Sequence, residues 1–417
     1  MRIIYLHQYF NTPEMSGGTR SYEMAKRLVA AGHEVHMVTS YRNKVDKKKT
    51  WFTTEESGIQ VHWFPVPYSN HMSYNQRIAA FFSFAFAAYK KAISLKGDIV
   101  FATSTPLTIA LPAVYTSKKL KIPMVFEVRD LWPEMPIAVG ALKNPLVKFF
   151  AKKLETWAYT NSAAIVALSP GMKQGVIKTG YPENQVAVIP NSSDNREFAY
   201  NEQAAQEFRA QRQWLGDKPL LIYAGAFGRV NGVDYMVPLA AELKKRQSDI
   251  RILVVGEGSE KAKVIAQAKA ANVFEDILFF EPPVPKKDIP ALFSAATVAS
   301  NLVIDLPEAR ANSANKFFDT LAAGKPILIN HGGWMHDVVV KHDCGFAVWQ
   351  QPVSEVAEQL ELKMHDQAWL KQSGQAAKAL AIESFDRDVL AQQLMAVLKS
   401  CVEQQGNQAW SIAPGKY

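Results

Sequence analysis

The stretch that decides the fold is MRIIYLHQYFNTPEMSGGTRSYEMAKRLVAAGHEVHMVT, from Met1 to Thr39. It predicts a strand at Met1–His7, a glycine-bearing loop, a helix at Arg20–Ala31 that stops at Gly32, and a strand at Glu34–Thr39. A strand, a helix and a second strand in this order form a βαβ unit, in which the strands are parallel and the crossover is right-handed. The chain therefore opens an α/β fold with a parallel sheet.

The same alternation continues along the chain, and it begins afresh after a polar, turn-rich segment, Pro190–Phe198. Further strands of the first half are predicted at Ile59–Phe64, Ile99–Thr103, Pro123–Val128, Ala163–Leu168 and Val186–Pro190. In the second half we predict strands at Leu220–Tyr223, Arg251–Val255, Ile277–Phe280, Val298–Val303 and Ile327–Asn330, and helices at Val233–Arg246, Glu260–Ala271, Ile289–Ala295 and Ala314–Ala323. We expect two Rossmann-like domains, 1–195 and 196–384, whose parallel sheets face a central cleft, and a final helix at about 385–417 that packs back on the first domain.

The composition is that of a soluble globular protein, with 48% hydrophobic and 21% charged residues in 417. Its two cysteines, Cys344 and Cys401, are too few for a disulfide framework and lack the spacing of metal ligands. The first residues show no secretory signal pattern. These features favour a cytoplasmic protein without a bound metal.

Positive charge is concentrated in the first half of the chain. Residues 1–195 hold 23 Lys/Arg and 13 Asp/Glu, whereas residues 196–417 hold 24 and 26. This asymmetry favours an anionic partner, either nucleic acid or an acidic membrane surface. The longest apolar run, Ile78–Ala88, is flanked by Arg77, Lys90 and Lys91 and is too short to span a membrane. It is either a helix in the membrane interface or an ordinary buried helix.

Loops that follow strands of a parallel sheet are the expected binding positions. The loop after the first strand carries Gly17 and Gly18, where backbone N–H groups can approach a phosphate, although a tight turn uses glycines too. In the second half, the loop AGAFGRVNG contains Gly228 and Arg229, and an arginine here is either a diphosphate ligand or a surface residue on a turn. The loop that starts GEGS, with Glu257, repeats the same strand, glycine loop and helix arrangement.

The most informative stretch for chemistry is NSANKFFDTLAAGKP, Asn312–Pro326. Small polar residues at a helix N-terminus, with Lys316 in the first turn, predict a phosphate site formed by Asn312, Ser313, Ala314 and Asn315. Asp319 is placed one turn past Asn315, where a carboxylate can hold the two hydroxyls of a ribose. The same letters also fit an amphipathic helix that ends at a glycine and a proline.

Charged residues also follow a strand of the first half, in EVRDLWPE. Arg129, Asp130 and Glu134 reach the carboxyl end of the sheet, where an unpaired charge is costly unless it is used. We expect a functional role for them; a structural Arg129–Asp130 ion pair is the alternative.

Taken in order, these segments resemble glycosyltransferase family 4, in particular the bacterial branch that builds O-antigen and capsule repeats and includes the N-acetylfucosamine transferases. The resemblance extends from LHQYF…SGGTR through FEVRDLWPE, ALSPGM and IPNSSD to AGAFGRVNGVDYMV, VGEGSEK and NKFFDTLAAGKPIL. It implies a GT-B fold and transfer of a sugar with retention of its anomeric configuration, without a metal or a protein general base.

The resemblance also implies roles for single residues. The glycines at Gly17 and Gly18 would lie under the donor phosphates, and Arg229 would supply one of two cations at the diphosphate. The second cation of the family is replaced by Asn231, a role that Lys316 can take over. Asp319 matches the second of the family's paired glutamates, while the first falls on Ala311, three residues from Glu308. Many members carry a histidine that touches the donor sugar where this chain has Arg129.

We therefore expect a sugar, often a modified or amino sugar, to be moved from a UDP- or similar nucleotide donor to a polyprenyl-diphosphate-linked acceptor. The basic first half would meet an anionic membrane surface on the inner face of the cell membrane, without nucleic acid. A nucleotide-sugar epimerase or hydrolase of the same fold and a non-enzymatic membrane-binding protein are the alternatives. The sugar, acceptor residue, linkage and oligomeric state stay open.

Overall fold

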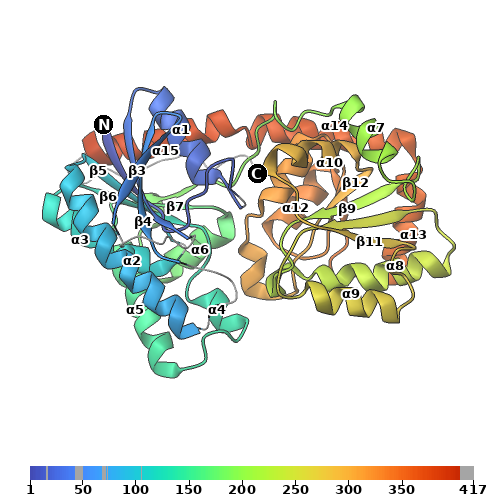
Figure 1. Ribbon diagram of the computed structural model, residues 1–417, viewed down its shortest axis with the longest axis horizontal. Coiled ribbons are helices and arrows are strands. Elements are labelled where there is room, and N and C mark those ends of the chain that lie inside the picture. Colours follow the sequence, from blue (N-terminus) through green and yellow to red (C-terminus); the bar gives the residue numbers. More distant parts are fainter. Residues whose placement is uncertain (16, 43–49, 68–71, 73, 105, 404–417) are drawn as a thin grey trace. The chain divides into compact units, whose positions relative to one another are not determined.

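The computed structural model describes residues 1–15, 17–42, 50–67, 72, 74–104 and 106–403 of the chain. Its contacts divide the chain into two compact units. Unit 1 comprises Met1–Pro190 and the segment that begins at Asp388, and unit 2 comprises Asn191–Arg387. Each unit is an α/β domain built on a largely parallel sheet, as the sequence predicts (Figure 1).

Unit 1 contains an 8-stranded sheet in the order β3-β4-β2-β1-β5-β6-β7-β8. The strands are β1 Arg2–Leu6, β2 Glu34–Tyr41, β3 Phe52–Glu56, β4 Ile59–Pro65, β5 Ile99–Thr103, β6 Met124–Val128, β7 Ala164–Ala167 and β8 Val186–Val188. All pair in parallel except β3, which forms an antiparallel hairpin with β4. The sequence analysis missed β3, because FTTEE is polar and largely exposed and lacks the alternation that marks a half-buried strand.

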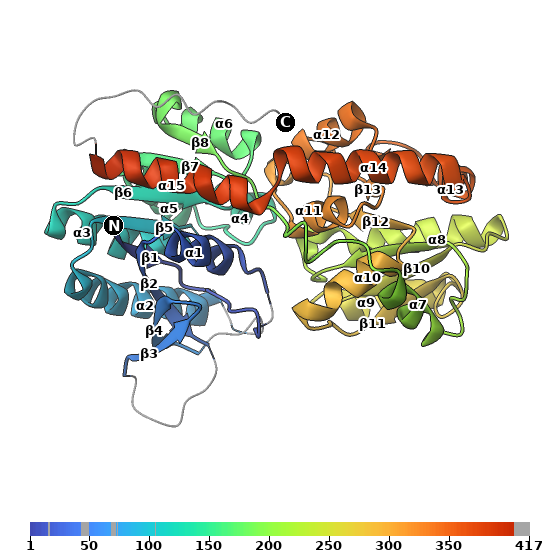
Figure 2. The same ribbon diagram turned by 90° about the horizontal axis from the view of Figure 1, so that it is seen from above.

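Helices cover both faces of this sheet. They are α1 Arg20–Ala30, α2 Tyr74–Leu95, α3 Ala110–Leu120, α4 Glu134–Ala138, α5 Pro145–Thr160, α6 Pro170–Lys178 and, from far along the chain, α15 Arg387–Glu403. Figure 2 shows α15 in red along the strands of unit 1. Its residues Leu394 and Leu398 are fully buried in one cluster with Ile3 and Tyr5 of β1. The last helix thus completes the core of the first unit.

Helix α2 corrects the prediction for the apolar run Ile78–Ala88, since it is twice as long, with 22 residues. Its 20-residue part Gln76–Leu95 is long and apolar enough to cross a membrane by length and composition, a criterion that a core helix also meets. Phe84 is fully buried, whereas Phe82 and Phe86 are 53% and 65% exposed. One side of α2 therefore packs on unit 1 and another presents aromatic rings to solvent.

Unit 2 contains a 6-stranded, fully parallel sheet in the order β11-β10-β9-β12-β13-β14. The strands are β9 Leu220–Ala224, β10 Arg251–Val255, β11 Leu278–Glu281, β12 Val298–Asn301, β13 Ile327–Ile329 and β14 Gly345–Ala347. The helices are α7 Glu202–Ala210, α8 Met236–Lys245, α9 Lys261–Ala270, α10 Ile289–Ala295, α11 Asn315–Ala322, α12 Trp334–His342, α13 Val353–Met364 and α14 Gln367–Ser384.

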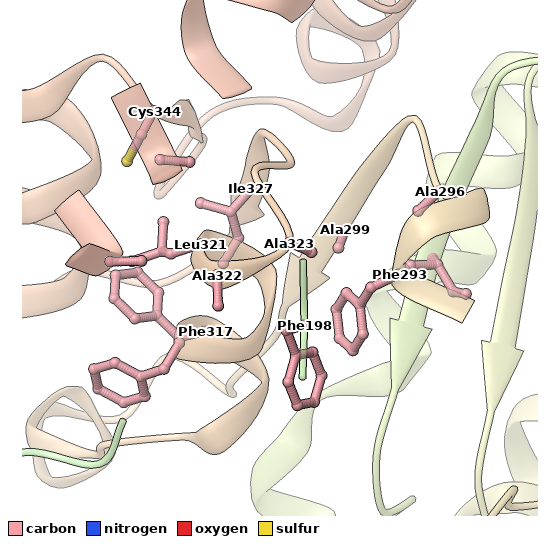
Figure 3. Packing of buried hydrophobic residues seen from close by; sticks show 14 of the residues in the cluster. Phe198, Phe293, Ala296, Ala299, Phe317, Leu321, Ala322, Ala323, Ile327 and Cys344 are labelled. Carbon is pink, nitrogen blue, oxygen red and sulfur yellow. The ribbon is translucent and has the colours of Figure 1, made fainter. Parts of the chain in front are cut away.

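One of the buried clusters of unit 2 holds α11 on its sheet. Phe317 and Leu321 of α11 pack near Ile327 of β13, as Figure 3 shows. The ring of Phe198 meets that of Phe293 edge-on, with 6.0 Å between the centroids. Cys344 lies fully buried in the same cluster as a free thiol. This packing fixes the position of α11, whose first turn was predicted to bind phosphate.

Each sheet reverses its strand order once. In unit 1 the reversal lies between β1 and β5, and in unit 2 between β9 and β12. Chains that leave two such neighbouring strands turn to opposite faces of the sheet, which opens a crevice at the carboxyl ends of the strands. The loops after these four strands are therefore the candidate binding positions of the two units.

Candidate functional site

In unit 2 the glycine loops after β9 and β10 pack backbone against backbone. The N–H of Gly225 donates to the carbonyl of Val255 at 2.9 Å, and the N–H of Phe227 donates to that of Glu257 at 2.9 Å. A Cβ at Gly256 would stand 1.9 Å from the carbonyl oxygen of Gly225. Glycine is thus required here for the loops to meet, whatever ligand they hold.

The predicted ligands at the tips of these loops differ in their surroundings. Glu257 forms an exposed ion pair with Lys261 at 3.0 Å, and this partner lowers the pKa of Glu257. Gly228 precedes the short helical turn Arg229–Asn231, on which Arg229 is exposed. The amide of Asn231 donates to the carbonyl of Ala226 at 2.8 Å. Asn231 therefore braces the loop from within, in the place where the family carries its second cation.

Lys316 lies over the end of β9. Its Nζ is 3.1 Å from the Tyr223 hydroxyl and 4.4 Å from the centre of the Tyr223 ring. A Cβ at Gly225 would come within 3.1 Å of the same Nζ. Burial lowers the pKa of Lys316 to about 8. The structure thus brings this lysine of α11 together with the first glycine loop, at the point where the strand order reverses.

The residues before α11 are tied to distant parts of unit 2. Asn191 donates its backbone N–H to Ser313 Oγ at 3.1 Å and its side-chain amide to the Ser313 carbonyl at 2.5 Å. The indole of Trp334 donates to the carbonyl of Asn312 at 2.7 Å. Ser313 and Asn312 are therefore anchors of the segment, whereas α11 itself begins after Ala314 without a side-chain cap.

No side chain of the N-cap residue accepts from the N–H groups of the first turn, which includes Asn315 and Lys316, and open N–H groups of this kind are what a phosphate site needs.

Asp319 lies one turn after Lys316 on α11 and is partly exposed. Burial raises its pKa to about 6, which Ser193, Arg387 and Lys286 oppose. The carboxylate is thus near the segment that follows unit 1 in the chain as well as near the loop after β11. This position is compatible with a ribose ligand.

The loop after β12 holds a cluster that the sequence analysis missed. Arg310 forms an ion pair with Asp305 at 2.8 Å and lies over the ring of Trp349, 4.7 Å from its centre. The Trp349 indole donates to Asp305 at 3.2 Å. These contacts fix the turn Pro307–Ala311, which contains both Glu308 and the alanine in place of the first family glutamate. Asp305 and Trp349 are 44 residues apart, so no local pattern reveals their contact.

In unit 1 the predicted glycine loop is held by Asn11. The Asn11 amide donates to the carbonyl of Gly18 at 3.2 Å, and Arg42 donates to the Asn11 side-chain oxygen. A Cβ at Gly17 would stand 2.6 Å from the Asn11 amide nitrogen, and its φ is 123°. The two glycines therefore form a turn that is packed on its own loop and leads into α1.

The next residue with a defined role is Arg20, which was not predicted. Its side chain is buried, with Nε 3.0 Å from Glu127 Oε1 and Nη1 2.5 Å from the Pro190 carbonyl oxygen. Glu127 also accepts from the Thr103 hydroxyl at 2.9 Å. This carboxylate at the end of β6 is thus fully used within the fold, and it places the start of α1 over the ends of β5 and β6.

Arg129 follows β6 and reaches across the sheet. Its Nη1 lies 3.4 Å from Nε2 of His7, the residue after β1, and its backbone N–H donates to Ser104 Oγ at 3.0 Å. Among the described residues no carboxylate stands within ion-pair distance of Arg129, so the alternative of an Arg129–Asp130 ion pair is not found. His7 and Asn11 were missed because their partners lie 122 and 31 residues away.

Asp130 has an exposed side chain, although its surroundings raise the pKa of its carboxyl to about 6 through burial. Glu134 begins α4, and one of its carboxylate oxygens is buried without a hydrogen-bond partner in the described part of the chain. Glu155 of α5, which is 3% exposed, is close enough to feel the charge of Glu134. Burial, together with the charge of Glu134, raises the pKa of Glu155 to about 8. The segment EVRDLWPE therefore supplies Arg129 at the carboxyl end of the sheet and Glu134, whose charge acts on the buried Glu155.

Comparison with known proteins identifies the family to which the two units belong. A model of the glycosyl transferase 4-like domain matches residues 17–192, and a model of glycosyl transferases group 1 matches residues 204–380. The chain is 24% identical over 297 residues to the putative colanic acid biosynthesis glycosyl transferase WcaI of Escherichia coli, covering 67% of this chain and 72% of that protein.

A second relative, the putative glycosyltransferase EpsF of Bacillus subtilis, is 30% identical over 95 residues, which span 23% of this chain and 25% of that protein. Among solved structures, Anabaena HepE in complex with UDP and glucose superposes with a TM-score of 0.71 at 16% identity and covers 96% of this chain and 100% of its own. At this identity the likeness establishes the fold.

Proposed function

Since the chain belongs to the glycosyltransferases of the GT-B fold, we propose that it moves a sugar from a nucleotide-sugar donor, UDP-linked, to a polyprenyl-diphosphate-linked acceptor. The product would be a surface polysaccharide of the O-antigen or capsule type. The proposal for the donor is supported by HepE, whose structure holds UDP and glucose, and that for the pathway by WcaI, which is named for colanic acid biosynthesis.

The observation that carries the proposal is the position of Lys316. Its ammonium group and the uncapped start of α11 meet the glycine loop after β9, at the reversal of strand order. A diphosphate bound there would receive backbone N–H groups, the positive end of a helix dipole and a cation. Arg229 on the neighbouring loop would add a second cation, and Asp319 would hold the ribose.

These groups suit a transfer in which charge builds up on the departing diphosphate. The bond between the sugar's anomeric carbon and the phosphate oxygen breaks, and a bond from the acceptor hydroxyl oxygen to that carbon forms on the same face. The acceptor's proton passes to the departing phosphate oxygen. Cations fixed before the reaction stabilise this charge without reorganisation. Retention of configuration and independence from a metal ion are part of the proposal.

The outer helices of unit 1 support a membrane-bound acceptor. Phe149 and Phe150 of α5 are 55% and 66% exposed and share their helix with Lys148, Lys152 and Lys153. Phe82 and Phe86 of α2 are exposed as well. We call these residues the aromatic surface of unit 1. Aromatic rings among lysines favour contact with an anionic lipid surface, and we propose attachment to the inner face of the cell membrane.

Binding of nucleotides followed by turnover tests this function. UDP, GDP and ADP are compared by the rise in melting temperature that each causes, and the sugars linked to the effective nucleotide are then assayed with a short polyprenyl-diphosphate-linked acceptor. We expect UDP to stabilise the protein and Lys316→Gln to remove most of that stabilisation and turnover, with an unchanged melting temperature in buffer. Equal stabilisation of wild type and Lys316→Gln would refute the site.

A further inference from the structure

Tyr223 lies near the carboxyl end of β9, is fully buried, and joins two parts of unit 2 through its hydroxyl. The hydroxyl donates to the carbonyl of Ala226 in the glycine loop at 2.9 Å, and Nζ of Lys316 donates to the hydroxyl oxygen at 3.1 Å. A tyrosine hydroxyl has one proton to give and an oxygen that can accept, so both bonds can form at once. Helix α11 and the loop after β9 are thus linked through one side chain.

The Ala226 carbonyl is an acceptor that Tyr223 shares. The side-chain amide of Asn231, in the turn Arg229–Asn231, donates to the same oxygen at 2.8 Å. Because the Tyr223 hydroxyl gives its proton to this carbonyl, its own oxygen becomes a better acceptor for a cation. The contacts therefore run from Lys316 through Tyr223 and Ala226 to the turn that carries Arg229.

The space around the Lys316 ammonium is narrow. A Cβ at Gly225 would stand 2.9 Å from Cε of Lys316 and 3.2 Å from the Tyr223 hydroxyl oxygen, and the centre of the Tyr223 ring is 4.4 Å from Nζ. In the described part of the chain no carboxylate forms an ion pair with this lysine. The hydroxyl and the ring of Tyr223 are therefore what these residues offer to hold the ammonium in place.

The charge of Lys316 also acts on His331, which is fully buried after β13. Burial lowers the pKa of His331 to about 4. Burial also holds the pKa of Tyr223 well above its usual range. Both side chains are thus neutral between pH 7 and pH 9, so a change of charge in this range belongs to Lys316.

We propose that Tyr223 is a positioning residue of the nucleotide site, whose hydroxyl holds the Lys316 ammonium at the glycine loop where the diphosphate of the donor binds. This inference rests on the proposed function, because it assumes that Lys316 binds that diphosphate. Tyr223 is fully buried and acts through the lysine. Its hydroxyl should therefore matter for nucleotide binding as long as Lys316 is present.

A double-mutant cycle of Tyr223→Phe and Lys316→Gln tests the inference, with UDP binding to the full chain measured by calorimetry at pH 7. Tyr223→Phe keeps the ring and removes the hydroxyl. We expect it to weaken UDP about threefold to tenfold, as for the loss of one hydrogen bond. In the Lys316→Gln background the same change should alter the affinity less than about twofold, because the residue through which it acts is gone.

The pH dependence separates positioning from a general loss of structure. Without its acceptor the ammonium form is disfavoured, so the pKa of Lys316 should fall further below about 8. UDP affinity, which needs the ammonium form, should then be lost about one pH unit lower in Tyr223→Phe than in wild type. A merely loosened fold would weaken UDP alike at every pH and leave the midpoint unchanged.

Tyr200 and Lys325 provide a matched control within unit 2. Nζ of Lys325 lies 4.7 Å from the centre of the Tyr200 ring, and burial lowers the pKa of Lys325 to about 8. Lys325 precedes β13, so this pair belongs to the amino end of the strand, whereas the proposed site lies at the carboxyl ends. Tyr200→Phe should change neither the UDP affinity nor its pH midpoint.

Three outcomes would overturn the inference. Tyr223→Phe could bind UDP as tightly as Tyr200→Phe does, it could keep the midpoint of wild type, or its effect could persist in full in the Lys316→Gln background. Each of these leaves the proposed function standing as long as Lys316→Gln alone weakens UDP and the wild type transfers sugar. If Lys316→Gln binds UDP as wild type does, the proposed nucleotide site itself is wrong.

Discussion

In the nucleotide site that we propose for unit 2, Lys316 is the residue whose charge state should control binding. Burial against Tyr223 holds its pKa at about 8, so its ammonium form is lost as the pH rises through that value. In most exposed lysines the loss begins about two units higher. Binding of a diphosphate through this group should therefore depend on pH in a range where other lysines stay charged.

We expect UDP affinity to fall by up to about tenfold between pH 7 and pH 9, since each unit above the pKa removes a further factor of about ten of the charged form. Lys316→Arg should bind with little change over this range, because a guanidinium does not titrate there. Calorimetric titrations at four pH values measure both. An equal fall of UDP affinity with pH in wild type and in Lys316→Arg would contradict the role of Lys316.

Glu155 is a residue whose burial lowers stability. Its pKa is raised to about 8 by burial and by Glu134, so the folded state holds a proton that the unfolded chain releases near pH 4.5. The free energy of unfolding that this group contributes is therefore greatest below about pH 4.5 and falls as the pH rises to about 8.

We predict that Glu155→Gln raises the free energy of unfolding of unit 1 by a few kcal/mol at pH 8, because about 1.4 kcal/mol accompanies each unit of pKa shift. Near pH 4.5 the variant and the wild type should be alike. Urea unfolding followed by the fluorescence of Trp157, on the same helix, reports the difference. Glu183→Gln, at an exposed carboxylate of unit 1, is the control, and an equal gain there would refute the mechanism.

The limits of prediction at this scale follow from distance in the chain. Arg129 and the glycines were predicted because they lie in loops that follow strands, where a parallel sheet binds its ligands. Lys316 was predicted because it lies in the first turn of a helix behind small polar residues. His7, Asn191 and Trp349 were missed because each acts through a partner more than 40 residues away. In GEGS, Gly256 makes the close contact between two loops, which the pattern of strand, glycine and helix does not reveal.

At the scale of elements, the two glycine loops of unit 2 extend the pairing of β9 and β10 beyond the strands themselves. Their contact leaves no room for a side chain at Gly256. The strands and helices that the sequence analysis named followed from periodicity, but it missed β3, β14 and several helices, among them α3, α12 and α13, and it underestimated the length of α2. Edge strands with polar faces and helices with mixed faces carry a weak periodic signal.

Gly256→Ala should separate these loops and destabilise unit 2 by about 1–3 kcal/mol or more, as overpacking does. It should also weaken UDP, since the loop after β9 moves away from Lys316. Thermal unfolding with and without UDP measures both effects. Gly228→Ala meets only a flexible amide at 3.2 Å and has negative φ, so its melting temperature should stay near that of wild type. A larger loss of stability in Gly228→Ala than in Gly256→Ala would contradict this role of Gly256.

The aromatic surface of unit 1 makes a second prediction at this scale. Phe149→Ser combined with Phe150→Ser should reduce binding to anionic liposomes at least about tenfold, because two exposed rings lose their place in the lipid interface. Cosedimentation with vesicles of phosphatidylglycerol and phosphatidylcholine measures this. Leu362→Ser, which removes an equally exposed apolar side chain from unit 2, should bind as wild type does. Binding that is indifferent to the lipid charge would argue against this surface.

At the scale of the whole molecule, the chain builds two units but passes between them twice, after Pro190 and after Arg387. The second passage brings α15 to the sheet of unit 1, where its apolar residues are buried with those of β1. A substitution in one unit should therefore lower the stability of that unit alone. A nucleotide bound to unit 2 should raise the melting temperature of unit 2 and leave that of unit 1 unchanged.

We predict that Leu394→Asp, a buried position of α15, destabilises unit 1 by several kcal/mol through an unpaired buried charge, and that UDP affinity is kept. Ala396→Asp, an exposed position of the same helix, should leave both unchanged. Scanning calorimetry with and without UDP separates the two units, since only the transition of unit 2 should shift with the nucleotide. A loss of UDP binding in Leu394→Asp would show that α15 also supports unit 2.

Because α15 belongs to unit 1 but follows unit 2 in the chain, it sets the order in which the two units can finish folding during synthesis. All strands of unit 1 are synthesised first, yet the helix that covers one face of their sheet emerges only after unit 2. At roughly 5–20 residues per second, that interval lasts on the order of 10–40 seconds. During this time the apolar face around Ile3 and Tyr5 is open to chaperones or to other nascent chains. The second unit to be translated is thus the first that can finish folding.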